Sequence, residues 1–266
     1  MAEKTDNSSQ PPVIVCFSGL DPTGGAGIQA DIEAIKANGG HCASLITSLT
    51  VQNTHNVKQL EPINTSLLAE QTDTLLSDIQ PDGFKLGVLG SSENAALIAD
   101  TIKQFPHCPV VLDPVLAAGG GTALTTTQLV EAIKHQLLPL TTICTPNTLE
   151  LQQLTSKQPI NQAAQLLLEY GVAAVLATGG HLLDSANTIQ HQLFINDQPA
   201  QALFSPRLPG EFHGSGCTLA SALATQLALK KSIALACQQG LDFTYQSLLN
   251  AVKIGSGQLI PTRHFY

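Results

Sequence analysis

The stretch PVIVCFSGLDPTGGAGIQADI, residues 12–32, joins an apolar run to a glycine-rich turn and then to a segment with helical periodicity. The apolar run over residues 12–19 predicts a buried strand. Ile28, Ile32 and Ile35 recur at the spacing of a helix that buries one face, so we expect all three in the core. A strand, a tight turn and a helix in this order are typical of a parallel α/β sheet, and the stretch therefore indicates the fold class.

The same alternation of strand and helix patterns repeats along the chain. Short β-rich runs, separated by helical patterns, occupy residues 44–51, 83–89, 109–115, 141–147 and 173–180. The stretch 191–207 turns at Asn196-Asp197 and predicts an antiparallel hairpin at the sheet edge. Residues 216–230 and 232–252 then predict two consecutive helices. We expect an α/β fold with a central, mostly parallel sheet, helices on both faces and an edge hairpin.

Length and composition limit the class of protein. The 266 residues suffice for one large domain or two small ones, and we expect a single domain over residues 13–266 because no linker or repeat divides them. Residues 1–12 are polar and predict a disordered N-terminus. A net charge of −8 argues against nucleic-acid binding, which needs clustered lysine and arginine. Without a secretory signal or an apolar run of roughly 20 residues, we expect a cytoplasmic protein with no membrane partner.

The six cysteines are widely spaced, and without a C-x-x-C pair they predict neither a zinc ribbon nor a dithiol redox motif. Cys16, Cys108 and Cys144 fall in or beside apolar segments, where a thiol packs as a small hydrophobe. Cys217 differs, because it lies in GEFHGSGCTLASAL, residues 210–223, where glycines precede a helix. The N-terminus of a helix attracts anions and can lower the pKa of a thiol. On the residues alone, an anion site and a tight turn with a packing cysteine both stay open.

The first glycine-rich turn leaves a similar choice. Its spacing matches neither the P-loop nor the dinucleotide-binding motif, so it permits either close contact with a ligand or tight packing of helix on strand. Asp31, on the helix that follows, could face solvent or point back into a pocket. Both alternatives stay open from the sequence pattern.

Further polar residues follow other strands, where ligands bind in open α/β sheets. Asp113 ends the strand at 109–115, and Thr178 ends the strand at 173–180. Asn147 and Glu150, in TPNTLEL at 145–151, are spaced for a capping box or for two oxygen ligands. We therefore expect a site at this edge of the sheet.

Taken together, these motifs resemble the ribokinase-like superfamily and, within it, the hydroxymethylpyrimidine/phosphomethylpyrimidine kinases of thiamine biosynthesis. The resemblance rests on an ordered set of segments: SGLDPTGGAGIQADI (18–32), TSLTVQNTHNV (47–57), TPNTLEL (145–151), ATGGHL (177–182), HGSGCTLASAL (213–223) and GSGQLIPTRHFY (255–266). It implies that ATP, with Mg²⁺, phosphorylates a small molecule, 4-amino-5-hydroxymethyl-2-methylpyrimidine, and in a second turnover the monophosphate. It also implies a homodimer.

The resemblance implies roles for individual residues. Gly214, Ser215, Gly216 and Cys217 would form a catalytic anion hole around the transferring phosphoryl group. The amide of Gln52 would read the edge of the aminopyrimidine, because it offers both a donor and an acceptor. The remaining roles are substrate binding by Gly19, Asp31, Val88 and the backbone of Val115, nucleotide binding by Asn147, Thr178, Gly180 and His213, and metal binding by Asp113 and Glu150.

Three positions depart from the pattern of that family. Gly119 and Thr178 stand where many members have lysine, and Val88 stands where many have methionine. Two charges that would neutralise phosphate are therefore missing, so Mg²⁺, the helix dipole and Lys85 or His213 would have to contribute more. The glycine-rich loop AAGGGT, 117–122, is a candidate lid.

Cys217 also stands where many sugar kinases have aspartate. The first acceptor is a neutral alcohol and the second an anionic phosphate monoester, so we hypothesise that Cys217 is a weak or switchable base that tolerates both. Two alternatives are kept. A pyridoxal/pyridoxine kinase would bind a similar planar ring with a hydroxymethyl arm, and a binding homologue of low activity would account for the missing lysines.

Overall fold

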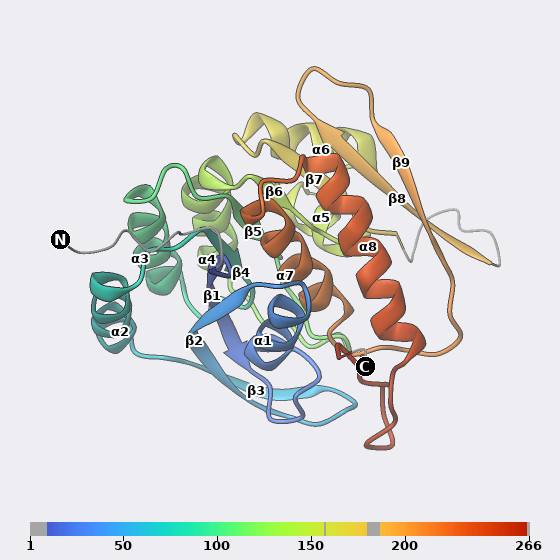
Figure 1. Cartoon of the computed structure of the whole chain (residues 1–266), viewed down its shortest axis with the longest axis horizontal. Helices are drawn as coiled ribbons and strands as arrows, with labels where there is room; N and C mark the ends of the chain where they lie inside the picture. Colours follow the sequence, from blue (N-terminus) through green and yellow to red (C-terminus); the bar gives the residue numbers. More distant parts are fainter. Residues whose placement is uncertain (1–9, 157, 180–186, 265–266) are drawn as a thin grey trace.

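The computed structural model describes residues 10–156, 158–179 and 187–264. The strands of this part form one nine-stranded sheet in the order β3-β2-β1-β4-β5-β6-β7-β8-β9 (Figure 1). Their bounds are β1 Val13–Leu20, β2 His41–Gln52, β3 Val57–Pro62, β4 Gly83–Leu86, β5 Val110–Leu112, β6 Ile143–Cys144, β7 Ala174–Ala177, β8 Thr188–Ile195 and β9 Gln201–Pro206.

The centre of the sheet is parallel and its edges are antiparallel. Strands β2, β1, β4, β5, β6 and β7 pair in parallel, whereas β3 pairs antiparallel with β2 and the β8-β9 hairpin pairs antiparallel with β7. The predicted parallel sheet and edge hairpin are thereby confirmed. Strand β3 was not predicted, because its sequence VKQLEP is polar and largely exposed at the edge.

Helices cover both faces of the sheet, as predicted. In Figure 1, α1, α7 and α8 gather on one face, while α2, α3 and α4 lie on the other side. Their bounds are α1 Gly27–Ala37, α2 Thr65–Asp78, α3 Ser92–Lys103, α4 Thr127–Ala132 with a π turn at Ile133–Leu137 and a 3-10 turn at Leu138–Leu140, α5 Thr148–Leu154, α6 Ile160–Glu169, α7 Ser215–Ala228 and α8 Ile233–Leu249. Within the described ranges, no helix is both long and apolar enough to cross a membrane.

Strand β1 shows why two cores form. Alternate side chains of a strand point to opposite faces, and β1 is buried on both. Val15 and Phe17 join the core beneath α2 to α6, whereas Ile14 and Cys16 join the core beneath α1, α7 and α8. The predicted packing role of Cys16 is confirmed, as are those of Cys144 and the partly buried Cys108.

Helix α1 departs from its predicted core stripe. Ile28 and Ile35 are buried, but the expectation that Ile32 is a core residue is wrong, since its side chain is 37% exposed. The helix instead turns Asp31, one residue earlier, into the interior. The burial of Asp31 depends on a buried partner for its carboxylate.

Candidate active site

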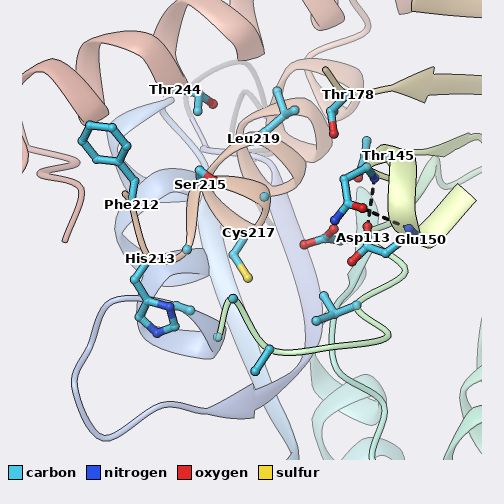
Figure 2. Close-up of a pocket in the computed structure, with 18 of the residues that line it drawn as sticks. Asp113, Thr145, Glu150, Thr178, Phe212, His213, Ser215, Cys217, Leu219 and Thr244 are labelled. Atoms are coloured by element: carbon cyan, nitrogen blue, oxygen red, sulfur yellow. Dashed lines mark hydrogen bonds between the residues drawn. The ribbon is translucent and has the colours of Figure 1, made fainter. Parts of the chain in front are cut away.

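A cavity of about 410 Å³ opens at the carboxyl ends of the parallel strands, where the loops after β1, β5, β6 and β7 meet the start of α7 (Figure 2). The sequence-predicted residues that line it are Gly19, Gln52, Val88, Asp113, Val115, Asn147, Glu150, Thr178, His213, Gly214, Ser215, Gly216 and Cys217. Asp31 is not among the lining residues. Gly180 lies outside the described residues.

The N-terminus of α7 closes one end of the cavity. Gly214 is the N-cap in a left-handed conformation, φ 81°, and a Cβ there would lie 2.0 Å from the carbonyl oxygen of Gly25. Only glycine meets both constraints. Because the first N–H groups of a helix lack intrahelical partners, residues 215–217 present donors and a partial positive charge at the cavity wall.

Cys217 follows within this first turn and is partly exposed. Burial raises the pKa of its thiol to about 12, although Lys85 opposes the shift. The sequence left open a pKa lowered by the helix N-terminus, and desolvation of the sulfur acts in the opposite direction. The residue carries a neutral thiol at neutral pH, which removes the support for a thiolate base in the free protein.

Two carboxylates face the start of α7. Asp113 and Glu150 are both buried at the cavity. Burial raises the pKa of each carboxyl, and the charge of Asp113 raises the pKa of Glu150 further. A nearby cation would relieve both effects, so these side chains fit a divalent ion that takes its other ligands from water and phosphate. Among the described residues, no group of three or more His, Cys, Asp or Glu side chains is placed to hold a metal alone.

Asn147 orients Glu150. The backbone N–H of Asn147 donates to Oε2 of Glu150 at 2.9 Å, and the N–H of Glu150 donates to Oδ1 of Asn147 at 2.9 Å (Figure 2). The capping-box interpretation is thus confirmed. It does not compete with a role in binding, because both residues also line the cavity.

Asp31 and Lys85 form a fully buried ion pair, with Nζ of Lys85 2.8 Å from Oδ1 of Asp31. Asp31 also accepts from the hydroxyls of Ser18 and Ser221, at 2.5 and 2.7 Å. Although burial disfavours the ammonium, Asp31 raises the pKa of Lys85. Neither residue lines the cavity, so the predicted contact of Asp31 with substrate is corrected and Lys85 is not a free cation for phosphate.

Gln52 and Thr50 line the cavity from the carboxyl end of β2. Nε2 of Gln52 donates to Oγ1 of Thr50 at 2.6 Å, and Thr50 donates to the carbonyl oxygen of Leu20 at 2.8 Å. This chain orients the amide. Gly19 completes this region, where a Cβ would lie 2.9 Å from Oγ of Ser48.

The first glycine-rich turn packs helix on strand, which is one of the two roles left open by its sequence, and it also lines the cavity. A Cβ on Gly27, φ 59°, would lie 2.2 Å from the carbonyl oxygen of Gly19, so the helix packs tightly on the strand. Gly19, Ala26 and Gly27 also line the cavity. The tight packing of helix α1 on strand β1 thus places backbone atoms of the turn at the cavity wall.

Asp21, which the sequence analysis missed, organises this turn. It accepts hydrogen bonds from Nε2 of His213 at 2.8 Å, from the N–H and hydroxyl of Thr23 at 2.8 and 2.9 Å, and from the N–H of Ala26 at 2.9 Å. Although burial acts to raise it, the bonds from His213 and Thr23 lower the pKa of Asp21. The D-P-T-G sequence is a turn signal that could have revealed this residue.

Further parts of the wall come from α8 and from the β8-β9 hairpin. The N–H of Gly179 donates to Nδ1 of His191 at 3.1 Å, and Nε2 of His191 lies 3.2 Å from Oγ of Ser205. His191 and Ser205 line the cavity but were not predicted, because no local motif links the hairpin to the site. Gly119, in the candidate lid, lines the cavity as well.

The sequence pattern of a family described as phosphomethylpyrimidine kinase matches residues 21–262. The chain belongs to this family. The family resemblance noted in the sequence is therefore confirmed.

Two relatives of this phosphomethylpyrimidine kinase family member differ in length. A hydroxymethylpyrimidine/phosphomethylpyrimidine kinase of Haemophilus influenzae is 34% identical over 259 residues, which cover 95% of this chain and 96% of that protein. The chloroplastic thiamine biosynthetic bifunctional enzyme TH1 of Arabidopsis thaliana is 33% identical over 271 residues, covering 98% of this chain and 52% of that protein. The chain thus spans about half of the plant enzyme.

Solved structures of similar proteins confirm the predicted ribokinase-like fold of this family member. An ADP complex of Bacillus subtilis pyridoxal kinase has a TM-score of 0.86 and 26% identity, covering 96% of this chain and 98% of that one. A phosphomethylpyrimidine kinase from Clostridium difficile has a TM-score of 0.75 and 29% identity, covering 90% of this chain and 100% of that one.

Proposed function

We propose that this protein transfers the γ-phosphoryl group of ATP to the hydroxymethyl group of 4-amino-5-hydroxymethyl-2-methylpyrimidine, and in a second turnover to the resulting monophosphate, for thiamine biosynthesis. One observation carries the proposal: a single cavity is lined by an oriented amide, Gln52, by the N-terminus of α7 and by two buried carboxyl groups. The names of the Haemophilus and Clostridium relatives support the same substrates.

Gln52 recognises the pyrimidine. With Nε2 engaged by Thr50, its carbonyl oxygen is available to accept a hydrogen bond from the exocyclic amino group of the ring. Gly19, Val88 and Val115 supply the walls against which the planar ring lies.

The start of α7 stabilises the transferring phosphoryl group. The N–H groups of residues 215–217 meet negative charge where it develops, which is the main requirement of phosphoryl transfer. Asp113 and Glu150 would hold Mg²⁺, and the bound ion would neutralise phosphate oxygens of ATP. Asn147 orients Glu150 for that task through the capping box. The nucleotide phosphates are surrounded by Thr178, His213 and the loop at Gly119.

Cys217 contributes by being neutral. Its raised pKa keeps a proton on the sulfur, so the residue places no fixed negative charge beside an acceptor that is itself anionic in the second turnover. The transition state is largely dissociative in most analyses, so the reaction depends on positioning and charge neutralisation more than on a strong base.

A second candidate is phosphorylation of pyridoxal, favoured by the close similarity of the fold to Bacillus subtilis pyridoxal kinase. A coupled assay of ADP release with the pyrimidine alcohol, its monophosphate and pyridoxal separates the candidates. Release with both pyrimidines supports the proposal, whereas release with pyridoxal alone supports the second candidate. No release with any acceptor would overturn both and favour a binding role. A homodimer, a cytoplasmic location and closure of the 117–122 loop complete the proposal, and sedimentation tests the first of these.

A further inference from the structure

Arg263, in the last segment of the chain, has no part in the site as described so far. It is completely buried and is the largest of the fully buried side chains in the described ranges. Its guanidinium donates from Nε to the hydroxyl of Thr218 at 2.9 Å, from Nη2 to the carbonyl oxygen of Gly25 at 2.6 Å, and from Nη1 to Oε2 of Glu33 at 3.1 Å. One planar group therefore joins three separate elements.

Two of these partners are the immediate neighbours of residues that line the cavity, since Gly25 precedes Ala26 and Thr218 follows Cys217. Gly25 lies in the turn that precedes α1, and Thr218 lies in the first turn of α7. The hydroxyl of Thr218 donates onward to the carbonyl oxygen of Gly214 at 2.8 Å. A continuous chain of hydrogen bonds thus runs from Arg263 to the N-cap of α7.

The glycine-rich turn and the N-terminus of α7 also contact each other, at the carbonyl oxygen of Gly25 that accepts from Arg263. A Cβ on Gly214 would lie 2.0 Å from the carbonyl oxygen of Gly25, and a Cβ on Gly25 would lie 2.5 Å from Cδ2 of His213. Backbone meets backbone here with no room for a side chain. A small displacement of either segment changes the spacing between the glycine-rich turn and the anion-binding N–H groups.

We propose that Arg263 is a positioning residue that fixes the spacing between the glycine-rich turn at residues 21–26 and the N-terminus of α7, and so sets the geometry in which phosphate is bound and transferred. The proposal rests on the proposed function in assigning phosphate to this end of the cavity. Arginine suits the task because its donors lie in one rigid plane, whereas lysine offers a single flexible ammonium. Its charge is compensated by Glu33, whose Oε2 lies 3.1 Å from Nη1.

Steady-state kinetics on the full chain test the proposal. Because a misplacement of about 1 Å can cost about 100-fold in rate, we expect Arg263→Met to lower kcat at least tenfold, while KM for the pyrimidine stays within about threefold. Arg263→Lys should recover only part of the rate. Thr218→Val should lower kcat in the same direction, and the double variant Arg263→Met with Thr218→Val should lose less than the product of the single losses, since both act through one chain. Glu70→Gln, on the exposed surface of α2 and outside this network, is the control and should stay close to wild type.

A binding measurement separates positioning from a loss of folding. In each folded variant, the rise in melting temperature caused by a non-hydrolysable ATP analogue should fall, while the rise caused by the pyrimidine alcohol should persist. If Arg263→Met does not fold, Arg263→Lys and Thr218→Val provide the same comparison. A folded Arg263→Met with wild-type kcat and analogue response would overturn the proposal, as would an equal loss of both responses. Failure of the wild-type protein to phosphorylate any acceptor would overturn the proposed function instead, and the analogue response would still test Arg263.

Discussion

Nε2 of Gln52 lies 2.6 Å from Oγ1 of Thr50, and this contact orients the amide. The hydroxyl of Thr50 has one hydrogen, which it donates to the carbonyl oxygen of Leu20, so it can only accept from Gln52. The amide therefore directs its carbonyl oxygen away from Thr50. An amide oxygen that is fixed in this way accepts from an exocyclic amino group, which an aminopyrimidine has and pyridoxal lacks.

Replacing Thr50 by valine should impair recognition of the aminopyrimidine. The two side chains have the same shape, but valine removes the hydroxyl that orients Gln52. We expect kcat/KM for the pyrimidine alcohol to fall roughly tenfold, the effect of one misoriented hydrogen bond of about 1.4 kcal/mol. Competition between this alcohol and pyridoxal provides the measurement, and Thr50→Ser is the control that should retain selectivity. An equal loss with both acceptors would contradict a role in orientation.

Replacing Cys217 by aspartate should affect the two turnovers unequally. The new carboxylate would stand next to Asp113, whose pKa burial already raises, and would repel an anionic acceptor more than a neutral one. We expect the second phosphorylation to slow by about tenfold more than the first, the effect of roughly 1.4 kcal/mol of added repulsion. Single-turnover timing of each step measures this. Cys217→Ser is the neutral control, and equal slowing of both steps would refute the charge argument.

Replacing Glu150 by glutamine should alter how stability depends on pH. Burial and Asp113 raise the pKa of Glu150 to about 8, so the folded protein prefers the protonated acid. Glu150 therefore contributes fully to the free energy of unfolding below its ordinary pKa of 4.5, and this contribution is lost as the pH rises toward 8. Glutamine can keep the capping box and carries no charge.

At pH 8 without divalent cations, Glu150→Gln should therefore melt at least about 2 °C above wild type, since a shift of one pKa unit is worth about 1.4 kcal/mol. The difference should shrink at pH 5, and Mg²⁺ with nucleotide should stabilise wild type more than the variant. Scanning calorimetry at both pH values checks this. Glu70→Gln, on the exposed surface of α2, is the control that should show neither change.

Replacing Lys85 by methionine should destabilise the whole fold. It would leave the carboxylate of Asp31 buried without its cation, and breaking a buried pair on one side costs roughly 3–5 kcal/mol. Adding Asp31→Asn should recover part of that loss, because the uncompensated charge is removed. Urea unfolding of the single and double variants measures both effects. No recovery in the double variant would show that the charge is not the cause.

The ion pair also explains where sequence reasoning succeeded and where it failed. Local patterns identified Asn147, Glu150 and the 213–217 segment, because a strand end or helix start determines where such residues lie. Asp31 could not be placed in this way. Its orientation depends on Lys85, 54 residues along the chain, and only a fold that brings them together makes burial of the carboxylate favourable.

The same reason applies to the residues that were missed. His191 and Ser205 reach the site from an edge hairpin, and Arg263 binds the carbonyl oxygen of Gly25 from far along the chain. Each is positioned by tertiary contacts across a long sequence separation, for which neither periodicity nor spacing carries a signal. The positions of glycines were more informative, since Gly214 must adopt a left-handed conformation that few other residues tolerate.

Replacing Thr178 by lysine should strengthen nucleotide binding. Thr178 lines the cavity at a position for which the family resemblance implies lysine in many members, and its N–H donates to the carbonyl oxygen of Pro146 at 2.9 Å. A cation there would face the phosphates of ATP and supply one of the two missing charges. We expect KM for ATP to fall about threefold to tenfold, and the gain to shrink as salt rises, because exposed charges are screened over about 10 Å at 0.1 M. Thr178→Met has similar length without charge and should show no gain. If methionine and lysine lower KM equally, the effect comes from packing and the missing charge is not what limits binding.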